Sequence, residues 1–316
     1  MAGGLSNRAS SQHAARGDRQ PRFSVVIPAF DAHLTLGNTL SAVLAETSAD
    51  WECIVVDDGS TDDTLSIARD FERRDPRFRV IHQANGGTAS AYNTAIAAAR
   101  GEFVTICSAD DVLLPEHLSR FSAFIDANPG YDIYSSNGWY WRPSEGRDLV
   151  DYDERSRGAH SKSLADVIRL CFYSVGATYR RELFDRAGGY RSEAFGEDYD
   201  FWLRAMALGA KHRYLPAPLS LFRVSAGQKS AELERGHRSN IRIVSELRDN
   251  FVLSPEERRA VEEKIAEENL RIVELQGGLV HGFRRRFEGL AVSVFGRTRA
   301  RRAWQSLRMV LRRLDR

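Results

Sequence analysis

The sequence predicts an α/β fold, in which helices flank a mostly parallel sheet and a helical extension follows at the C-terminus. Three observations predict it. Short apolar, β-branched runs alternate with helical stretches through residues 22–130, the pattern of βαβ units. The run Glu52–Val56 is apolar almost throughout, as in strands buried on both faces of a parallel sheet. A capping box with proline at the first helical position begins at Ser254 and indicates a long helix near the end of the chain.

In the first half, predicted strands and helices alternate at short intervals. The strands are Phe23–Ile27, Glu52–Val56, Arg79–His82 and Phe103–Cys107. The helices are Thr35–Leu44, Leu65–Arg74, Ala89–Arg100 and Glu116–Ala127. Because crossovers between parallel strands are right-handed and short, these four strands are expected to lie in one sheet.

The order loosens after Pro129. Further strands are expected at Asp132–Ser136, Val175–Tyr179 and Leu219–Val224, and helices at Ser161–Leu170, Arg181–Ala187 and after Gly196. Residues 139–153 form an aromatic-rich stretch with no clear period, in which Trp139, Tyr140 and Trp141 could stack on a sugar or pack in the core. Two helical segments complete the chain. One begins at Ser254, and the other carries apolar residues at helical spacing from Ala300 to Leu314.

Composition places the chain among soluble globular proteins. Apolar residues make up 42% and charged residues 28%. Residues 1–21 lack an apolar run and are predicted to be a disordered tail. No run of 18 apolar residues exists, and the three widely spaced cysteines indicate neither a disulfide framework nor a zinc site, which fits a cytoplasmic location. We expect one large domain over residues 22–228 and a helical extension over 229–316.

The net charge of +2 hides an uneven distribution. Residues 281–316 contain eleven arginines against Glu288 and Asp315, which gives this end +9 and leaves −7 for the preceding 280 residues. Three interpretations of this basic helical end stay open. It could lie on an anionic membrane surface, pack on the protein body or a partner helix, or bind nucleic acid without specificity.

Aspartates follow two of the predicted central strands. Asp57 and Asp58 follow the second strand, and Asp110 and Asp111 follow the fourth. In open parallel sheets, ligands bind beyond the carboxyl ends of the strands. Adjacent carboxylates repel each other and resist desolvation, and a hard cation that bridges to an anionic ligand would relieve both costs. The alternative is that Asp110 or Asp111 caps a helical turn before Pro115.

Four segments together resemble the family 2 glycosyltransferases in order and spacing. They are Ser-Val-Val-Ile-Pro-Ala-Phe at 24–30, Val-Val-Asp-Asp-Gly-Ser-Thr-Asp at 55–62, Ala-Asp-Asp at 109–111, and Gly-Glu-Asp-Tyr-Asp-Phe-Trp-Leu at 196–203. The resemblance covers about residues 22–225. It implies an inverting enzyme with a GT-A fold, in which residues of about 22–130 bind the nucleotide and residues of about 131–228 bind the acceptor.

The resemblance also implies a set of nucleotide-sugar contacts. Asp58 would accept a hydrogen bond from the ring NH of a uracil-like base, although it could instead cap the turn at Gly59. Gly87 and Asn93 would close over the nucleotide and sugar, although Gly86-Gly87 could be a plain loop before a helix. The other expected nucleotide-sugar residues are Pro28, Ala29, Phe30, Asp57, Ser108, Ala109 and Arg223.

The remaining implied roles concern the metal and the base. Asp110, with Asp111 beside it, would hold a divalent cation, Mn²⁺ or Mg²⁺. Asp198 would be the catalytic base and Glu197 would support its orientation, although both could simply form a helix N-terminal turn favoured by the helix dipole. Trp202 lies on the apolar face of that helix and is expected in the core.

The chain departs from the family pattern at two places. Ser108 stands where the family usually has an aspartate, and the last strand lacks the histidine often found near the diphosphate. Arg223 is retained in that stretch and could contact a phosphate oxygen. Both departures weaken the expectation of tight metal dependence more than that of sugar transfer.

The function implied by the resemblance is transfer of a sugar from a nucleotide-diphosphate sugar, most simply a UDP-sugar, to an acceptor hydroxyl. A saccharide or lipid-linked saccharide would be the acceptor, in cell-surface polysaccharide or glycolipid synthesis at the inner face of the membrane. The alternative is a nucleotide-sugar-binding protein with lost or weak catalysis. No dinucleotide or Walker motif is present, and no specific nucleic acid partner is expected.

Overall fold

The computed structural model of the chain describes residues 20–142, 146–148, 162–170, 175–191, 195–224 and 233–276. The predicted tail, apart from Gln20 and Pro21, and the arginine-rich end at 281–316 lie outside the described residues. In the described part, no helix is long and apolar enough to cross a membrane.

The first half folds as the sequence predicts. Its strands and helices are β1 (Phe23–Ala29), α2 (Leu36–Leu44), β2 (Trp51–Asp57), α3 (Thr64–Arg74), β3 (Phe78–His82), α4 (Thr88–Ala98) and β4 (Phe103–Ile106). β1 pairs in parallel with both β2 and β4, and β2 pairs in parallel with β3. Every residue of β2 is buried, as its continuous apolar run indicates.

The second half completes one mixed sheet. Its members are β5 (Val112–Leu113), α5 (His117–Ala127), β6 (Ile133–Arg142), β7 (Gly146–Asp148), α6 (Leu164–Leu170), β8 (Thr178–Arg180), α7 (Glu182–Ala187), α8 (Glu197–Ala207) and β9 (His212–Arg223). The strand order is β3-β2-β1-β4-β8-β6-β9-β5, with β7 paired to β6. The pairings give β1, β2, β3, β4, β6 and β9 one direction and β5, β7 and β8 the other, so the described sheet is mostly parallel.

Two strands of this half are longer than predicted. β9 begins at His212, whereas the expected strand began at Leu219, because Pro216 and Pro218 disguise its first part. Its register with β6 shifts next to Asn137, so the chain bulges where the prolines lie. The aromatic-rich stretch begins as the second half of β6 and turns back as β7.

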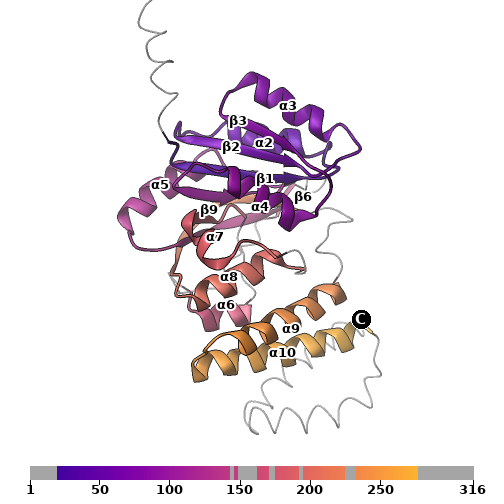
Figure 1. Cartoon of the computed structure of the whole chain (residues 1–316), viewed down its shortest axis with the longest axis vertical. Helices are drawn as coiled ribbons and strands as arrows, with labels where there is room; N and C mark the ends of the chain where they lie inside the picture. Colours follow the sequence, from indigo (N-terminus) through magenta and orange to yellow (C-terminus); the bar gives the residue numbers. More distant parts are fainter. Residues whose placement is uncertain are drawn as a thin grey trace, which may run out of the picture.

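The C-terminal extension contains two described helices, α9 (Leu233–Asn250) and α10 (Pro255–Leu275). The predicted capping box is confirmed: the backbone N–H of Glu257 donates to the hydroxyl of Ser254, and the Glu257 carboxylate accepts from the Ser254 backbone. α9 was not separately predicted. In Figure 1 the two helices run side by side below α6 and α8.

Buried apolar residues form a core on each face of the sheet. On one face, side chains of α2, α3 and α5 cover β1 and β2. On the other, α4, α6, α7 and α8 cover the sheet, and α9 and α10 add to the same cluster. Trp202 is fully buried there and donates its ring N–H to the hydroxyl of Tyr179, which confirms the prediction that it belongs to the core.

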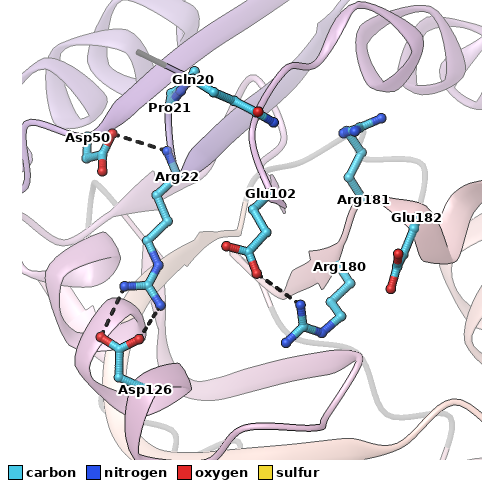
Figure 2. Close-up of a pocket in the computed structure, with 9 residues that line it drawn as sticks. All are labelled: Gln20, Pro21, Arg22, Asp50, Glu102, Asp126, Arg180, Arg181 and Glu182. Atoms are coloured by element: carbon cyan, nitrogen blue, oxygen red, sulfur yellow. Dashed lines mark hydrogen bonds and ion pairs between the residues drawn. The ribbon is translucent and has the colours of Figure 1, made fainter.

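A cavity of about 630 Å³ lies at the amino-terminal edge of the central strands. Figure 2 shows two pairs of charged side chains in its lining, Arg22 with Asp126 and Arg180 with Glu102. Arg22 makes a two-pronged contact with Asp126, and Arg180 donates to Glu102 at 3.0 Å. Because the predicted site residues follow the carboxyl ends of the strands, this cavity belongs to the opposite edge of the sheet.

Glu46 generates a prediction about stability. Its side chain is buried, and only Oε2 has a hydrogen bond within the described structure, from the backbone N–H of Leu118 at 3.1 Å. Burial raises the pKa of Glu46 to about 8, against a smaller lowering by that hydrogen bond. Between pH 4.5 and 8 the folded state therefore keeps a proton that the unfolded state releases, so the free energy of unfolding falls as pH rises, by at most about 1.4 kcal/mol per pH unit.

We expect Glu46→Gln to remove this part of the pH dependence and to be more stable than the wild type at pH 8. Urea unfolding at pH 5 and pH 8 measures it, with Glu116→Gln, an exposed glutamate nearby, as the control. An unchanged pH dependence in Glu46→Gln would contradict the assignment.

Candidate active site

The topology brings the predicted site residues to one edge of the sheet. Ala29, Asp57 and His82 are in register at the carboxyl ends of β1, β2 and β3. Ser108–Asp111 directly follow β4, which is the other neighbour of β1. β9 runs in the same direction as these strands, so Arg223 at its end reaches the same edge.

Asp58 holds the loop between β3 and α4. Its Oδ1 accepts from the side-chain amide of Gln83 at 2.7 Å and from the backbone N–H of Gly86 at 2.9 Å, and its Oδ2 accepts from the N–H of Gly87 at 2.8 Å. Asp58 is buried, so these donors offset the desolvation of its carboxylate. All three donors belong to the loop between β3 and α4, and none belongs to the turn at Gly59. The carboxylate of Asp58 therefore orders the loop that contains Gly87. The predicted contact with a base stays a prediction.

Gly59 must be a glycine for this loop to lie where it does. Its φ is +75°, and a Cβ there would lie 2.8 Å from the backbone N of Asn85. The loops after β2 and β3 are therefore in close backbone contact.

Asp57 is fully buried, and its partner is a histidine that the sequence analysis did not single out. The Nδ1 of His82 lies 2.6 Å from Oδ2 of Asp57. Oδ1 of Asp57 has no hydrogen-bond partner among the described residues. One feature of the sequence could have predicted this pair: Asp57 and His82 end neighbouring predicted strands, and the structure places them in register.

The loop after β1 presents the segment Pro28–Phe30. Phe30 is half exposed, Pro28 is half-buried and Ala29 is buried. Asp31 fixes this loop to the one after β2: its carboxylate accepts from the N–H of Thr61 at 2.8 Å, and its own N–H donates to the Ser60 hydroxyl at 3.0 Å. The loop that carries Phe30 is therefore fixed by these hydrogen bonds, and the exposed ring is accessible for stacking.

Asp111 turns toward β9 rather than toward the following helix. The backbone N–H of Arg223 donates to its Oδ1 at 3.0 Å, and the Nε of Arg223 donates to the carbonyl of Asp110 at 2.9 Å. α5 begins only at His117 and has no side-chain cap. The alternative in which Asp110 or Asp111 caps a helical turn is therefore not what the structure shows.

The electrostatics of this pair favour a positive partner. Burial and the neighbouring charge of Asp110 raise the pKa of Asp111 well above its usual range, while Arg223 and the Ser108 hydroxyl lower it. Thr39 of α2 fixes the backbone here by donating to the carbonyls of Ala109 at 3.0 Å and Asp111 at 2.8 Å.

Arg223 is anchored on both sides. Its guanidinium lies over the ring of Trp141 at 4.2 Å from the centroid, and the two residues are paired between β6 and β9. In β6 the neighbouring Tyr140 packs edge-on against Phe222. Two of the three aromatic residues predicted to stack on a sugar, Tyr140 and Trp141, therefore make contacts within the protein. The contact with Trp141 orients Arg223 beside Asp110.

Asn93 links α4 to the segment that precedes α8. Its side-chain amide donates to the carbonyl of Tyr190 at 2.8 Å, and its carbonyl oxygen accepts from the N–H of Tyr190 at 2.9 Å. This two-way contact pairs the Asn93 side chain with protein backbone. Closure over a sugar by Asn93 stays a prediction.

Glu197 and Asp198 form the first turn of α8. Gly196 precedes them at φ +97°, a conformation that glycine adopts without strain. Glu197 accepts from the N–H of Gly196 at 3.3 Å, and Asp198 accepts from the N–H of Tyr199 at 2.8 Å. Both side chains are half-buried. The helix dipole favours their negative charge at this position.

Tyr92 of α4, which the sequence analysis missed, is buried and packs against the ring of Tyr190, with the ring centroids 5.2 Å apart. Burial raises its pKa well above the usual value, and interaction with the Ser108 hydroxyl lowers it. The charges of Cys107, Glu197 and Asp111 raise it further. The position of Tyr92 next to Asn93 in α4 was the only available signal.

The residues at this edge fit a cation that takes most of its ligands from a substrate. Within the described ranges, no three or more His, Cys, Asp or Glu side chains are grouped to hold a metal. Asp110 and the buried Asp111 remain the candidate ligands, and two carboxylates completed by substrate phosphates are a usual arrangement for Mg²⁺.

The family model of glycosyl transferase family 2 matches residues 24–188. The chain belongs to this family. Among family members it is similar to an uncharacterized glycosyltransferase, EpsJ of Bacillus subtilis (strain 168), at 32% identity over 218 residues, which cover 64% of this chain and 61% of EpsJ. It is also similar to the succinoglycan biosynthesis protein ExoU of Rhizobium meliloti (strain 1021), at 30% identity over 209 residues, 60% of this chain and 58% of ExoU.

The family fold is confirmed by a solved structure. The chain superposes on S. aureus TarS 1–349 in complex with UDP-GlcNAc with a TM-score of 0.66 at 22% identity, covering 79% of this chain and 73% of that one. At this identity the likeness shows the GT-A fold of this family 2 glycosyltransferase. The chain spans about three fifths of the length of the curated relatives it matches.

Asp58 provides a prediction for the site. In Asp58→Asn, one backbone N–H of the Gly86-Gly87 pair would face an amide NH₂ instead of an oxygen, and the charge would be lost. Because hydrogen bonds to charged groups contribute about 1.5–3 kcal/mol, we expect a loss of stability of that order and faster amide exchange at Gly86 and Gly87. Urea unfolding and hydrogen exchange measure both.

The matched control is Asp63→Asn, an exposed aspartate that follows the same strand. Wild-type protection at Gly86 and Gly87 in Asp58→Asn would show that the carboxylate does not order the loop.

Proposed function

We propose that the protein is an inverting glycosyltransferase that transfers a sugar from a nucleotide-diphosphate sugar, with a uridine nucleotide as the first candidate, to an acceptor hydroxyl. The observation that carries the proposal is geometric: Ala29 and Asp57 are in register at the carboxyl ends of β1 and β2, and at the same edge Arg223 donates to the carbonyl of Asp110 and to the carboxylate of Asp111. Membership in family 2 and the UDP-GlcNAc complex of TarS support the donor class. The name of ExoU supports polysaccharide or glycolipid synthesis as the setting.

The donor nucleotide would bind over the ends of β1 and β2. The exposed ring of Phe30 can stack on a base, and Pro28 and Ala29 would contact the base next to that ring. Asp58 retains acceptor capacity, since a carboxylate has about four lone-pair positions and three donors are in place. A ring NH of uracil could take the fourth position.

A divalent cation, Mn²⁺ or Mg²⁺, would be held by Asp110 and Asp111. When bound, it would supply positive charge beside the leaving diphosphate. Arg223, fixed against Trp141, places a permanent positive charge at the same place. This arrangement explains how the site could accept Ser108 where the family usually has an aspartate.

Asp198 would act as the base, with Glu197 beside it. The acceptor oxygen attacks the anomeric carbon while its proton passes to the Asp198 carboxylate. The bond from that carbon to the diphosphate oxygen breaks, and its electron pair leaves with the diphosphate. A single displacement of this kind inverts the anomeric centre. A positioned base typically contributes about 10²–10⁴-fold to such a step.

Asp198→Asn tests the role of the base. We expect transfer to fall by about 10²–10⁴-fold, because the amide cannot take the proton, while UDP binding measured by calorimetry stays within about twofold. The control is Asp185→Asn, an exposed aspartate on α7. Near wild-type transfer by Asp198→Asn would refute the assignment.

The same assays separate the enzyme from the nucleotide-sugar-binding alternative, which the serine at 108 favours. A panel of nucleotide sugars is first screened by thermal stabilisation, since a ligand that binds only the folded state raises the melting temperature. Each stabilising donor is then assayed for hydrolysis and transfer with Mn²⁺ or Mg²⁺. Binding without turnover for every donor would support the alternative.

We further propose that the arginine-rich residues 281–316 bring the enzyme to an anionic membrane surface on the cytoplasmic side, near a lipid-linked acceptor. The full chain should pellet with phosphatidylglycerol vesicles but not with phosphatidylcholine vesicles, and high salt should release it. A chain ending at residue 280 should stay in the supernatant. Equal pelleting of both chains would exclude this role.

A further inference from the structure

We propose that the helix pair α9–α10 contributes to the active site by holding the Gly196–Asp198 turn in position. Asn240 and Glu268 are the positioning residues. This inference rests on the proposed role of Asp198. It extends the site to a region that the family model, which ends at residue 188, does not cover.

α9 passes directly behind the turn. A Cβ on Gly236 would lie 3.5 Å from the Phe195 ring, and a Cβ on Gly196 would lie 4.0 Å from both Oδ1 of Asn240 and Cδ1 of Ile243. The guanidinium of Arg235 lies over the Phe195 ring at 4.8 Å. Successive turns of α9 therefore support the two residues that precede Glu197.

A second set of contacts fixes the body of α8 to α9. Asp200, which is almost fully buried, accepts from Nε of Arg191 and from Nε of Arg204, both at 2.9 Å. The same Arg191 donates to Glu246 of α9 at 3.0 Å. Ile243 and Leu247, which also belong to α9, pack into the hydrophobic core. The Gly196–Asp198 turn thus lies against α9 at its start, and Asp200, two residues after Asp198, is linked to α9 indirectly, because Arg191 contacts both Asp200 and Glu246.

A buried polar cluster fixes α9 on α10. Oε1 of Glu268 lies 2.7 Å from Nζ of Lys264 and accepts from the Asn240 amide at 3.1 Å, and Oε2 lies 2.5 Å from Nδ1 of His237. Glu268 and Lys264 are almost completely buried. Burial acts to raise the pKa of Glu268, but these partners together lower it below its usual value.

This cluster specifies one register between the two helices. Sliding α9 by a turn would remove His237 and Asn240 from the buried Glu268 and leave it only Lys264, which lies on the same helix. The loss of hydrogen-bond partners from a buried charged group is costly. Asn240 is the link, since its amide nitrogen donates to Glu268 while its Oδ1 lies 4.0 Å from where a Cβ on Gly196 would be. Figure 1 shows the resulting stack, in which α9 lies between α8 and α10.

The consequence is that the helical extension controls the position of the base. A displacement of about 1 Å at a reacting group can cost about 10²-fold in rate. The nucleotide-binding loops belong to the ends of β1, β2 and β3, so they do not depend on α9. Loosening α9 should therefore lower kcat while KM for the donor stays the same.

The test uses Asn240→Ala and Glu268→Gln in the full chain. We expect kcat to fall about tenfold or more in each, with donor KM and UDP affinity unchanged, and amide exchange at residues 196–199 to become faster. The control is Glu263→Gln, on the same helix α10, whose ion pairs run to Arg169 and Arg259 rather than to α9. It should leave kcat and the exchange rates unchanged.

The outcomes are distinguishable. Wild-type kcat and wild-type exchange at 196–199 in a folded Asn240→Ala protein would overturn the inference. A fall in kcat that merely follows the unfolded fraction at the assay temperature would also overturn it. If Glu268→Gln does not fold, Asn240→Ala decides. If the wild type transfers no sugar, the proposed function fails, whereas the exchange measurement still tests whether Asn240 holds the turn.

Discussion

The structure depends on offsetting the repulsion among aspartates at one edge of a sheet. Three of the carboxylates there have a named partner. Asp58 accepts from the loop of Gly86 and Gly87, Asp57 contacts His82, and Asp111 accepts from the backbone of Arg223. Because an uncompensated buried charge is costly, each contact also fixes a loop. The loops at this edge are therefore ordered by the contacts of these carboxylates.

The mixed sheet makes this compensation possible. Six described strands share one direction, so β9 delivers Arg223 to the edge where β4 delivers Asp110 and Asp111. β5 then runs back along β9 and fixes the chain directly after Asp111. A sheet limited to the parallel half would have collected the acidic residues without the arginine that lies beside them.

The surroundings of α8 are organised by helices and aromatic rings rather than by strands. Asn93 ties α4 to the backbone of Tyr190, and the ring of Tyr190 packs against Tyr92 and Phe201. Tyr190 thereby links α8 to α4. From behind, α9 and the buried Glu268 cluster fix the same helix. α8 is thus held by contacts both with the Asn93–Tyr190 pair and with α9.

The sequence by itself determined the alternation of strands and helices, the edge at which the aspartates gather, the burial of Trp202 and the family, because these follow from short-range periodicity and motif order. Only the tertiary structure decided which donors each carboxylate meets, since the partners of Asp58 and Asp111 lie 25 to 112 residues away. It also decided the full length of β9, whose prolines hide its pairing, and the contact of α9 with Gly196. Local patterns carry no information about such long-range pairing, because it depends on which faces the folded chain brings together.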